Sequence, residues 1–436
     1  MGATRLSGTE RRICERIRGD VDALIALVAE LVSSDTTSRE PGEPAREEER
    51  LQRFLAGRLR AVGADVDLWE PEPTAPGNGF VPDNLDFKGR PQLVARIPGL
   101  GDGPSLLLNG HIDAVPSGDE SEWTSPPLRA TIRDGRLFGR GACDMKGGLA
   151  CLLFAAEALH HESVRLRGDL VYCANTDEES SGAGGRAVVA RGLSADAGIC
   201  AEPTAFDVWT VCRGTWLATA RLSGRRGHAE VTMPHWREGG AVNAIERLPL
   251  VLDAVRRLRE DWRTRPDHQH PLVSPGDVVP TVVRGGEWMV MYPADCSLTV
   301  DVTYLPGHVD ARGSGAGVGR EVMDAVAAAC SVDPWTREHP PTWEFLCDTV
   351  PAEVPSTHAI AQLALAVGAD VGREGRIGGL DSWHDAATYS LAGIPTVSFG
   401  PGGLMSAHRA DEYVPVADLV DYSCAAALAM MRFCGA

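Results

Sequence analysis

The fold prediction rests on two neighbouring stretches, NGHIDAVP at residues 109–116 and GRGACDMKGG at residues 139–148. An apolar run at 105–109 precedes the first stretch, and its length and turn-rich borders are typical of a buried strand. The second stretch leads into a predicted helix over 148–160. This alternation of strand and helix predicts an α/β layer with a mixed, mostly parallel sheet.

The same alternation extends outward along the first half of the chain. Apolar residues at helical spacing predict a helix that starts near Asp20 and another over 47–62. Short apolar runs predict further buried strands at 92–97, 169–174 and 197–201. These elements place residues 1–212 in one α/β unit.

The pattern changes beyond residue 212. The next segment predicts two helices on an antiparallel sheet, with strands at 215–223, 278–283 and 296–304 and helices over 242–258 and 319–330. From 343 the earlier pattern returns, with a helix near 357–367 and a strand at 395–400. The sequence therefore predicts two domains, an α/β domain built from 1–212 and 343–436 and a smaller α+β domain inserted at 213–342.

The composition excludes several classes of protein. The formal net charge of −18 argues against general binding to nucleic acids or anionic membranes, which require a cationic surface. No run of about 18 apolar residues predicts a membrane span. The polar N-terminus lacks the apolar core of a signal peptide, and the eleven cysteines are odd in number and scattered. We therefore expect a cytoplasmic protein whose cysteines are small core residues.

Residue types that bind metals recur where the predicted strands end. They are His111, Asp144, Glu179, Glu202 and His408, in the segments NGHIDAVP, GRGACDMKGG, NTDEESSG, AEPT and SAHRADEYV. In parallel-sheet folds the carboxyl ends of strands converge on one crevice, so these distant residues can meet there. A carboxylate that bridges two metals, with a His and a carboxylate on each, is a chemically sensible dinuclear site.

Each of these residues also has a purely structural interpretation. Asp144 precedes a glycine-rich helix start and could be an N-cap, and the pair Glu178–Glu179 could be a solvated acidic loop. His111 alone is more often a hydrogen-bonded structural residue, and Asp113 could cap a turn or orient the imidazole. The argument for a metal site is therefore the joint occurrence of all five.

The ordered motifs GHIDAVP, GRGACDMKGG, TDEE, EPT and AHRADEYVP resemble those of the M20 family of metallopeptidases, from about residue 20 to 430. This family includes acetylornithine deacetylase and succinyl-diaminopimelate desuccinylase, and the EPT form is similar to that branch. The resemblance implies a zinc-hydrolase α/β domain that carries an inserted lid domain, through which two subunits form a homodimer.

The resemblance also implies roles for the residues. Asp144 would bridge two divalent ions, most typically Zn²⁺, with Co²⁺ or Mn²⁺ as alternatives; Glu179 and His408 would complete one site, and His111 and Glu202 the other. Asp113 would hold the imidazole of His111. Glu178 would be the general base that takes a proton from the attacking water and passes it to the leaving amine.

The inserted segment and the C-terminal part supply further candidates. In SGRRGHAE, His228 resembles the lid histidine that stabilises the oxyanion in the partner's active site. In GGLDSWHDAATYSLAGIP, Gly378, Gly379 and Asp385 match the family's substrate loop loosely, and His384 is a candidate substrate contact that the family does not usually have.

One residue departs from the family pattern. In LTVDVTYLPG, Thr303 stands where relatives commonly carry an Arg that grips a substrate carboxylate. Arg284 could substitute for it, or could be only a hairpin residue. We expect a metal-dependent hydrolase that cleaves the amide of an N-acyl amino acid or a related small compound. The alternatives are an aminopeptidase or dipeptidase on the same scaffold, and a non-catalytic relative that binds a ligand.

Overall fold

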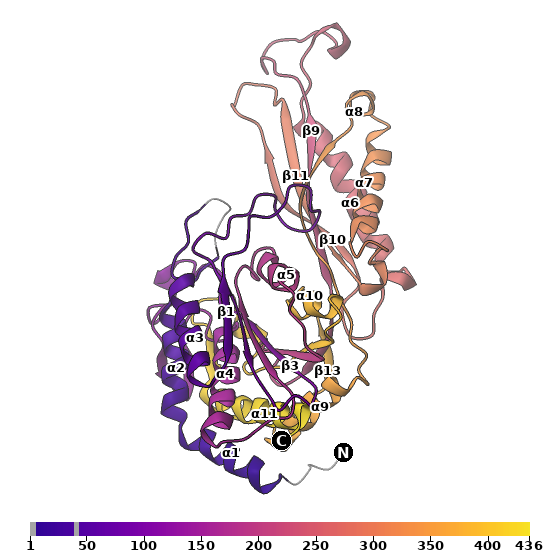
Figure 1. The fold of residues 1–436 in the computed structure, drawn as a ribbon. Helices are drawn as coiled ribbons and strands as arrows, with labels where there is room; N and C mark the ends of the chain where they lie inside the picture. Colours follow the sequence, from indigo (N-terminus) through magenta and orange to yellow (C-terminus); the bar gives the residue numbers. More distant parts are fainter. Residues whose placement is uncertain (1–5, 39–42) are drawn as a thin grey trace.

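The computed structural model describes residues 6–38 and 43–436, and its largest element is an eight-stranded sheet with strand order β1-β2-β6-β3-β7-β14-β8-β13 (Figure 1). The strands are β1 (Asp65–Trp69), β2 (Gln92–Ile97), β3 (Leu106–His111), β6 (Leu170–Asn175), β7 (Ala197–Cys200), β8 (Val208–Cys212), β13 (Ile377–Leu380) and β14 (Thr396–Ser398). The central strand β3 is parallel to β6 and to β7, and β7 is parallel to β14. Because β1 and β2 pair antiparallel at one end, the sheet is mixed and mostly parallel, as predicted.

Helices cover both faces of this sheet. One face carries the larger group, α1 (Gly8–Gly19), α2 (Val21–Ser33), α3 (Glu48–Ala61), α4 (Lys146–His161), α9 (Ala359–Asp370) and α11 (Val416–Cys434). The other face carries α5 (Ala183–Ala190) and α10 (Ala386–Leu391). Helices on both faces leave the strand ends as the open rim of this domain.

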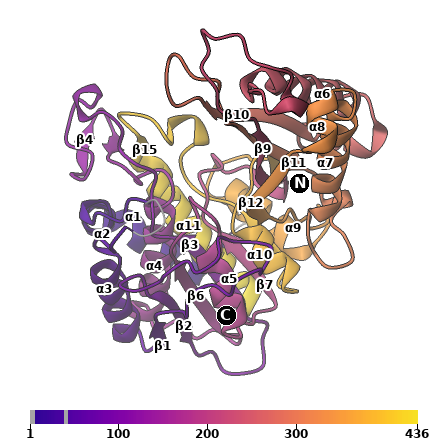
Figure 2. The same ribbon diagram turned by 90° about the horizontal axis from the view of Figure 1, so that it is seen from above.

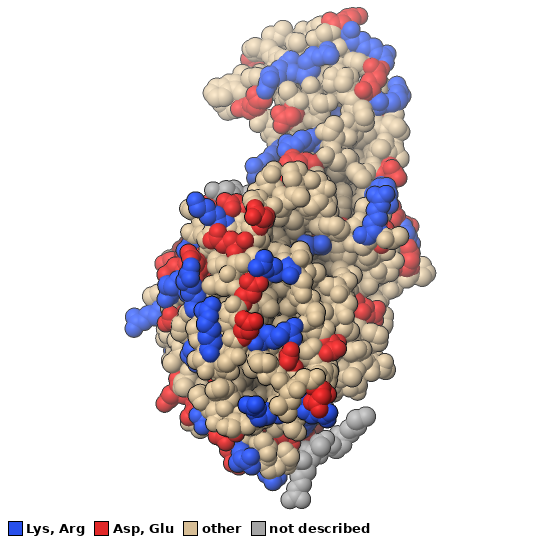
Figure 3. All heavy atoms as spheres, in the orientation of Figure 1, with Lys and Arg blue, Asp and Glu red and all other residues tan. Residues whose placement is uncertain are grey.

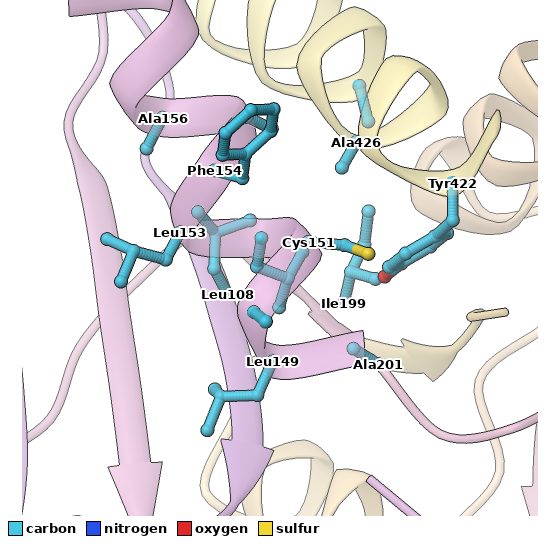
Figure 4. Close-up of a cluster of buried hydrophobic side chains, with 14 of the residues drawn as sticks. Leu108, Leu149, Cys151, Leu153, Phe154, Ala156, Ile199, Ala201, Tyr422 and Ala426 are labelled. Carbon is cyan, nitrogen blue, oxygen red and sulfur yellow. The ribbon is translucent and has the colours of Figure 1, made fainter. Parts of the chain in front are cut away.

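Helix α4 lies at the centre of the core, with almost every side chain buried. Figure 4 shows Leu149 and Leu153 of α4 beside Leu108 of β3, and Tyr422 of α11 beside Ile199 of β7. The first turn of α4 lies so close to β7 that a Cβ on Gly148 would come within 2.2 Å of the Ala201 carbonyl oxygen. The glycines of GRGACDMKGG therefore allow the helix to start directly above the strand ends.

A four-stranded antiparallel sheet with order β10-β11-β9-β12 forms the second domain, the lid. Its strands are β9 (Gly214–Ser223), β10 (Asp277–Gly285), β11 (Asp295–Tyr304) and β12 (Thr342–Thr349), and its helices are α6 (Leu248–Trp262), α7 (Ala316–Cys330) and the short α8 (Pro334–Glu338). Alternate residues of β11 pack against α6 and α7 to form a separate core. Figure 2 shows the lid to one side of the large sheet.

Strand β12 pairs with β9 in the lid sheet, although a division at residue 343 assigns it to the α/β domain. We therefore propose that the inserted segment extends to Thr349. The start of α6 also differs from the prediction of residue 242, because residues 242–247 form a bridge with Arg225 and a 3-10 turn before Pro249 enters the first turn of the helix.

A small three-stranded sheet, with order β15-β5-β4, lies beside the strand ends. It consists of β4 (Thr131–Arg133), β5 (Arg136–Phe138) and β15 (Tyr413–Pro415), and it joins the segment before Asp144 to the segment after His408. Acidic and basic side chains are interspersed over the face drawn in Figure 3. No helix of the described residues is long and apolar enough to span a membrane.

Candidate metal centre and active site

Five predicted metal ligands meet at the rim of the large sheet. His111 is the last residue of β3, Glu179 follows β6, and Glu202 follows β7. Asp144 precedes the first residue of α4, and His408 lies between β14 and β15. The carboxyl ends of the parallel strands thus bring together residues that are up to about 300 positions apart in the sequence.

The donor atoms form two groups that share one carboxylate. His111, Asp144 and Glu202 make the first group and Asp144, Glu179 and His408 the second; within each group one ligand atom of every residue lies within 4.8 Å of the others. The two oxygens of Asp144 face different histidines, with Oδ1 3.3 Å from Nε2 of His111 and Oδ2 3.3 Å from Nε2 of His408. This is the arrangement expected of a carboxylate that bridges two ions.

The first group is fully buried, whereas the second is open on one side. His111 is 1% exposed, and the side chain of His408 is 49% exposed. His408 also contacts Glu179, with Nε2 3.1 Å from Oε2. Water and a small substrate can therefore reach the site from the side of His408.

Asp113 contacts both the imidazole of His111 and the acidic loop after β6. The Nδ1 atom of His111 lies 2.9 Å from the backbone carbonyl oxygen of Asp113 and 3.6 Å from its carboxylate. The carboxylate instead accepts hydrogen bonds from the backbone N–H groups of Glu178 and Glu179, at 3.3 and 3.0 Å. The backbone of Asp113 therefore orients the imidazole, while its side chain positions the acidic loop after β6.

Glu178 lies beside the donor groups and belongs to neither of them. Its Oε2 atom is 3.9 Å from Nε2 of His111, and its side chain is only 9% exposed. Consecutive side chains of the loop diverge, so Glu179 faces His408 while Glu178 faces His111. Glu178 is thus a buried carboxylate next to the place where the two groups meet.

Burial and neighbouring charges shift the pKa values of the five candidate ligands and of Glu178. Burial and the nearby Asp144 raise the pKa of Glu202 to about 8, and burial raises the pKa of Glu178 well above its usual range. Hydrogen bonds to Asp144 and Glu179 raise the pKa of His408 to about 10. Burial opposes ionisation of Asp144, yet the two histidines hold its pKa well below normal. The acids therefore depend on positive charge placed among them.

This site fits the divalent ions that the sequence motifs imply. Oε1 of Glu179 is buried and has no hydrogen-bond partner among the described residues, although the rest of that carboxylate is engaged. Nitrogen and carboxylate donors of this kind are the usual ligands of zinc and of related ions. A cation within the two groups would satisfy the free oxygen and balance the buried acids.

Glu412 connects two loops of the site, and the sequence motifs gave no reason to single it out. One carboxylate oxygen accepts hydrogen bonds from the N–H groups of Cys143 and Asp144, at 2.9 and 3.1 Å, and the other lies 2.5 Å from Nη1 of Arg140. Arg140 and Glu412 are both almost completely buried. The only signal in the sequence was that the two residues lie inside the motifs GRGACDMKGG and AHRADEYVP.

A second set of supports lies below the strand ends. The amide of Asn109 donates to Oδ1 of Asn175 at 2.8 Å, and Asn175 donates in turn to the carboxylate of Asp385. The ammonium group of Lys146 donates to the Ser34 carbonyl at 2.9 Å, and burial lowers the pKa of Lys146 to about 8. These polar groups are buried, and their mutual hydrogen bonds order the residues beneath the metal ligands.

The candidate substrate residues near the C-terminus are not exposed at the rim. Gly378 and Gly379 belong to β13, where a Cβ on Gly379 would come within 2.5 Å of a methyl group of Val273. His384 and Asp385 are 4% and 1% exposed. His384 forms a 2.8 Å hydrogen bond with the Ser398 hydroxyl, and burial lowers the pKa of its imidazole to about 4.

The lid candidates lie apart from the two donor groups. His228 is exposed, belongs to neither donor group, and lies in the segment that follows β9, where its backbone pairs with Met291. Thr303 lies near the end of β11, opposite Asp277 and Thr215, and its hydroxyl oxygen is buried without a hydrogen-bond partner among the described residues. Arg284 is an exposed residue of the edge strand β10.

Comparison with known proteins shows the family to which the chain belongs. Residues 107–432 match the sequence model of Peptidase family M20/M25/M40. The chain belongs to this family. It is 30% identical to acetylornithine deacetylase of Myxococcus xanthus, over 95% of this chain and 98% of the relative. It is 29% identical to N-formyl-4-amino-5-aminomethyl-2-methylpyrimidine deformylase of Halalkalibacterium halodurans, over 92% of each chain.

Solved structures agree on the fold. A di-peptidase from Saccharomyces cerevisiae superposes with a TM-score of 0.76 at 14% identity, covering 99% of this chain and all of that one. Human carnosine dipeptidase 1 gives a TM-score of 0.74 with the same identity and coverage. The chain is therefore a metal-dependent hydrolase of the M20 type, a family that implies a dinuclear metal site.

Proposed function

We propose that this enzyme hydrolyses the amide bond of a small N-acyl compound at a site that holds two divalent metal ions. The observation that carries the proposal is the sharing of Asp144 by two donor groups, with a further buried carboxylate, Glu178, beside them. His111, Asp144 and Glu202 would hold one ion and Asp144, Glu179 and His408 the other. Zn²⁺ suits these donors best, and Co²⁺ or Mn²⁺ could replace it.

The protein's own residues would handle the proton. When bound, such a pair of ions makes water more acidic and polarises an amide carbonyl. Glu178 would take a proton from the attacking water and deliver it to the nitrogen of the leaving amine. Its backbone N–H, held by the Asp113 carboxylate, keeps its side chain next to His111. Asp385 and His384, both buried, would position these elements and would not contact the substrate.

The names of the relatives and the residues at Thr303 and Asp301 guide our proposal for the amine part of the substrate. One relative is named a deformylase and another a deacetylase, and each aligns with nearly the whole chain. The amines in these two names are different compounds. Thr303 replaces the arginine expected for gripping a carboxylate, and the neighbouring Asp301 carries a buried oxygen without a partner among the described residues. We therefore propose an N-formyl or N-acetyl amine whose amine part needs no carboxylate, with N-acyl amino acids as the second class.

The lid would also join two subunits. Strand β10 is an edge of the lid sheet, and Val282 and Val283 on it are 42% and 53% exposed. Trp288 and Met289, just beyond the strand, are 63% and 90% exposed. Such an apolar edge favours association. In a homodimer formed there, we propose that His228 reaches the partner's site and donates a hydrogen bond to the oxyanion.

The cysteines support a proposal about the cellular compartment. All eleven are buried and free of disulfides. A chain that keeps so many thiols unpaired suits a reducing environment, so we propose that the enzyme acts in the cytoplasm.

The test is a panel of N-formyl amines, N-acetyl amines, N-acyl amino acids and dipeptides, assayed for amine release after reconstitution with Zn²⁺ or Co²⁺. We expect metal-dependent release from the N-acyl amines, with at least a hundredfold loss in Glu178→Ala at unchanged metal content. Glu374→Ala, which changes an exposed glutamate far from the donor groups in sequence, serves as the matched control. Absence of release from every compound, with two ions bound, would refute the proposal.

A further inference from the structure

Two histidines in the lid lack the hydrogen bonds that buried imidazoles normally have. His268 ends a short 3-10 turn after α6 and is completely buried, and His308 ends a similar turn after β11, with a side chain that is 14% exposed. None of their four ring nitrogens has a hydrogen-bond partner among the described residues. A buried imidazole without a hydrogen-bond partner lowers the stability of the fold by about 1–3 kcal/mol, so the absence of partners at this pair suggests that a ligand binds there.

The geometry of the neighbours shows where that ligand would lie. The ring of His268 is stacked on Trp262 and lies tilted by 36° against the ring of His308, with ring centroids 4.2 Å apart in both pairs. Its Nδ1 atom faces Gly276, where a Cβ would come within 2.7 Å, so this nitrogen is closed off by backbone. The Nε2 atoms of His268 and His308 both face Oδ2 of Asp267, at 3.9 and 3.7 Å.

These separations are too long for hydrogen bonds and suit a shared ion. Zinc binds imidazole nitrogen at about 2.0–2.1 Å and carboxylate oxygen at about 2.0–2.2 Å, so two of its ligands are at most about 4.2 Å apart. One ligand atom from each of Asp267, His268 and His308 lies within 4.8 Å of the others. Both imidazoles are also kept neutral, since burial lowers the pKa of His268 to about 4 and lowers that of His308 as well.

The local charge favours a cation. The guanidinium of Arg265 is surrounded by three carboxylates, those of Asp261, Asp267 and Glu321. This leaves a net charge of about −2 around two neutral imidazoles. Arg265 donates to both oxygens of Asp267, from Nη2 to Oδ2 at 2.7 Å and from Nε to Oδ1 at 3.2 Å, and thereby holds the carboxylate in place.

We propose that Asp267, His268 and His308 form a third divalent-ion site, in the lid, with zinc as the preferred ion and water in its open position. The site would tie the end of α6 to the end of β11, and therefore stabilise the lid without taking part in the hydrolysis. It shares no residue with the two groups around Asp144, so it stands whether or not the proposed amide substrate is correct.

The test counts zinc ions on the full-length protein. The chain is stripped with a chelator, reloaded with excess Zn²⁺, freed of loose metal by gel filtration and analysed for metal and protein. We expect three ions per wild-type chain and two per chain in His308→Ala and in Asp267→Ala. His235→Ala, which removes an exposed lid histidine outside the donor groups, should keep three.

Two further readouts separate a binding role from a general effect on folding. An ion that binds only the folded lid raises the melting temperature. Zinc should therefore raise the melting temperature less in His308→Ala and Asp267→Ala than in the wild type. In His235→Ala the increase should be as large as in the wild type. Amide hydrolysis should be unchanged. Asp267 is half exposed, so Asp267→Ala decides the matter if His308→Ala fails to fold. Two ions on the wild type, or three on Asp267→Ala, would overturn the proposal.

Discussion

The α/β domain and the lid treat charge in opposite ways. The α/β domain buries the ion pair Arg140–Glu412 beside the predicted metal ligands, and Glu412 also accepts two backbone hydrogen bonds there. In the lid, the pair Arg259–Asp277 between α6 and β10 keeps both side chains a quarter to a third exposed. An arginine–carboxylate pair is thus part of the candidate site in the α/β domain, whereas in the lid such a pair lies at the surface. Burial and hydrogen-bond supports, more than residue type, mark the place where chemistry is expected.

The strongest way to test this contrast is to remove the buried carboxylate. Glu412→Ala leaves the guanidinium of Arg140 buried without its partner, which is expected to lower the free energy of unfolding by about 3–5 kcal/mol. The N–H groups of Cys143 and Asp144 lose their acceptor as well, so metal affinity should fall by roughly 10–100-fold. Urea unfolding and metal titration measure the two effects. Glu412→Gln, which can still accept from both N–H groups, should retain more metal affinity than Glu412→Ala; equal loss would contradict the positioning role.

Replacement of the exposed lid histidine His228 should change the turnover rate and leave stability and metal content unchanged. His228→Ala removes no buried contact, so stability and metal content should stay as in the wild type. If His228 donates to an oxyanion in the partner's site, the turnover rate should fall by about 10²–10³, which corresponds to about 2.7–4 kcal/mol. Steady-state kinetics on the substrate found by the panel gives the answer. His235→Ala is the matched control, and equal rates in both variants would remove His228 from the mechanism.

Part of the fold could be predicted because local patterns were strong. The strand, the polar turn and the helix around Asp144 carry apolar runs and glycines that suit only that arrangement, and the structure has them within two residues. Helix α1 was missed because its sequence is highly charged, yet Ile13 and Ile17 are buried and Ser7 with Glu10 forms a capping box. Strand β13 was missed because IGGL carries two glycines, which weaken any strand pattern.

The site shows the same division between local and tertiary information. Four of the five predicted ligands lie at or after the end of a strand or before helix α4, and such positions are visible in a sequence. His408 instead lies in the loop between β14 and β15. The hydrogen bonds that the carboxylates of Asp113 and Glu412 accept from backbone N–H groups of other segments could not be predicted. Those contacts depend on loop conformations that no periodicity records.

A buried residue next to the site should impose a pH dependence on stability. The pKa of His384 is about 4 in the folded protein and about 6.5 in an unfolded chain, so the unfolded state takes up the proton first as the pH falls. The contribution of His384 to stability is therefore fully present above about pH 6.5 and is lost between about pH 6.5 and pH 4, by at most about 3 kcal/mol. Urea unfolding of the metal-free protein across this range should show a shallower decrease in His384→Asn than in the wild type. Parallel curves would contradict this assignment.

The smallest effect on stability is expected at the partly exposed lid pair Arg259–Asp277, which has the same kinds of charged groups as Arg140–Glu412. Nη2 of Arg259 donates to Oδ2 of Asp277 at 2.7 Å, a separation as favourable as that of the buried pair. Water reaches this partly exposed pair, screens it and can solvate either partner alone, so Asp277→Ala should lower the free energy of unfolding by less than about 1 kcal/mol. Urea unfolding of Asp277→Ala beside Glu412→Ala measures the difference directly. A cost at Asp277 as large as that at Glu412 would mean that the lid surface is covered in solution, as a homodimer through β10 would require.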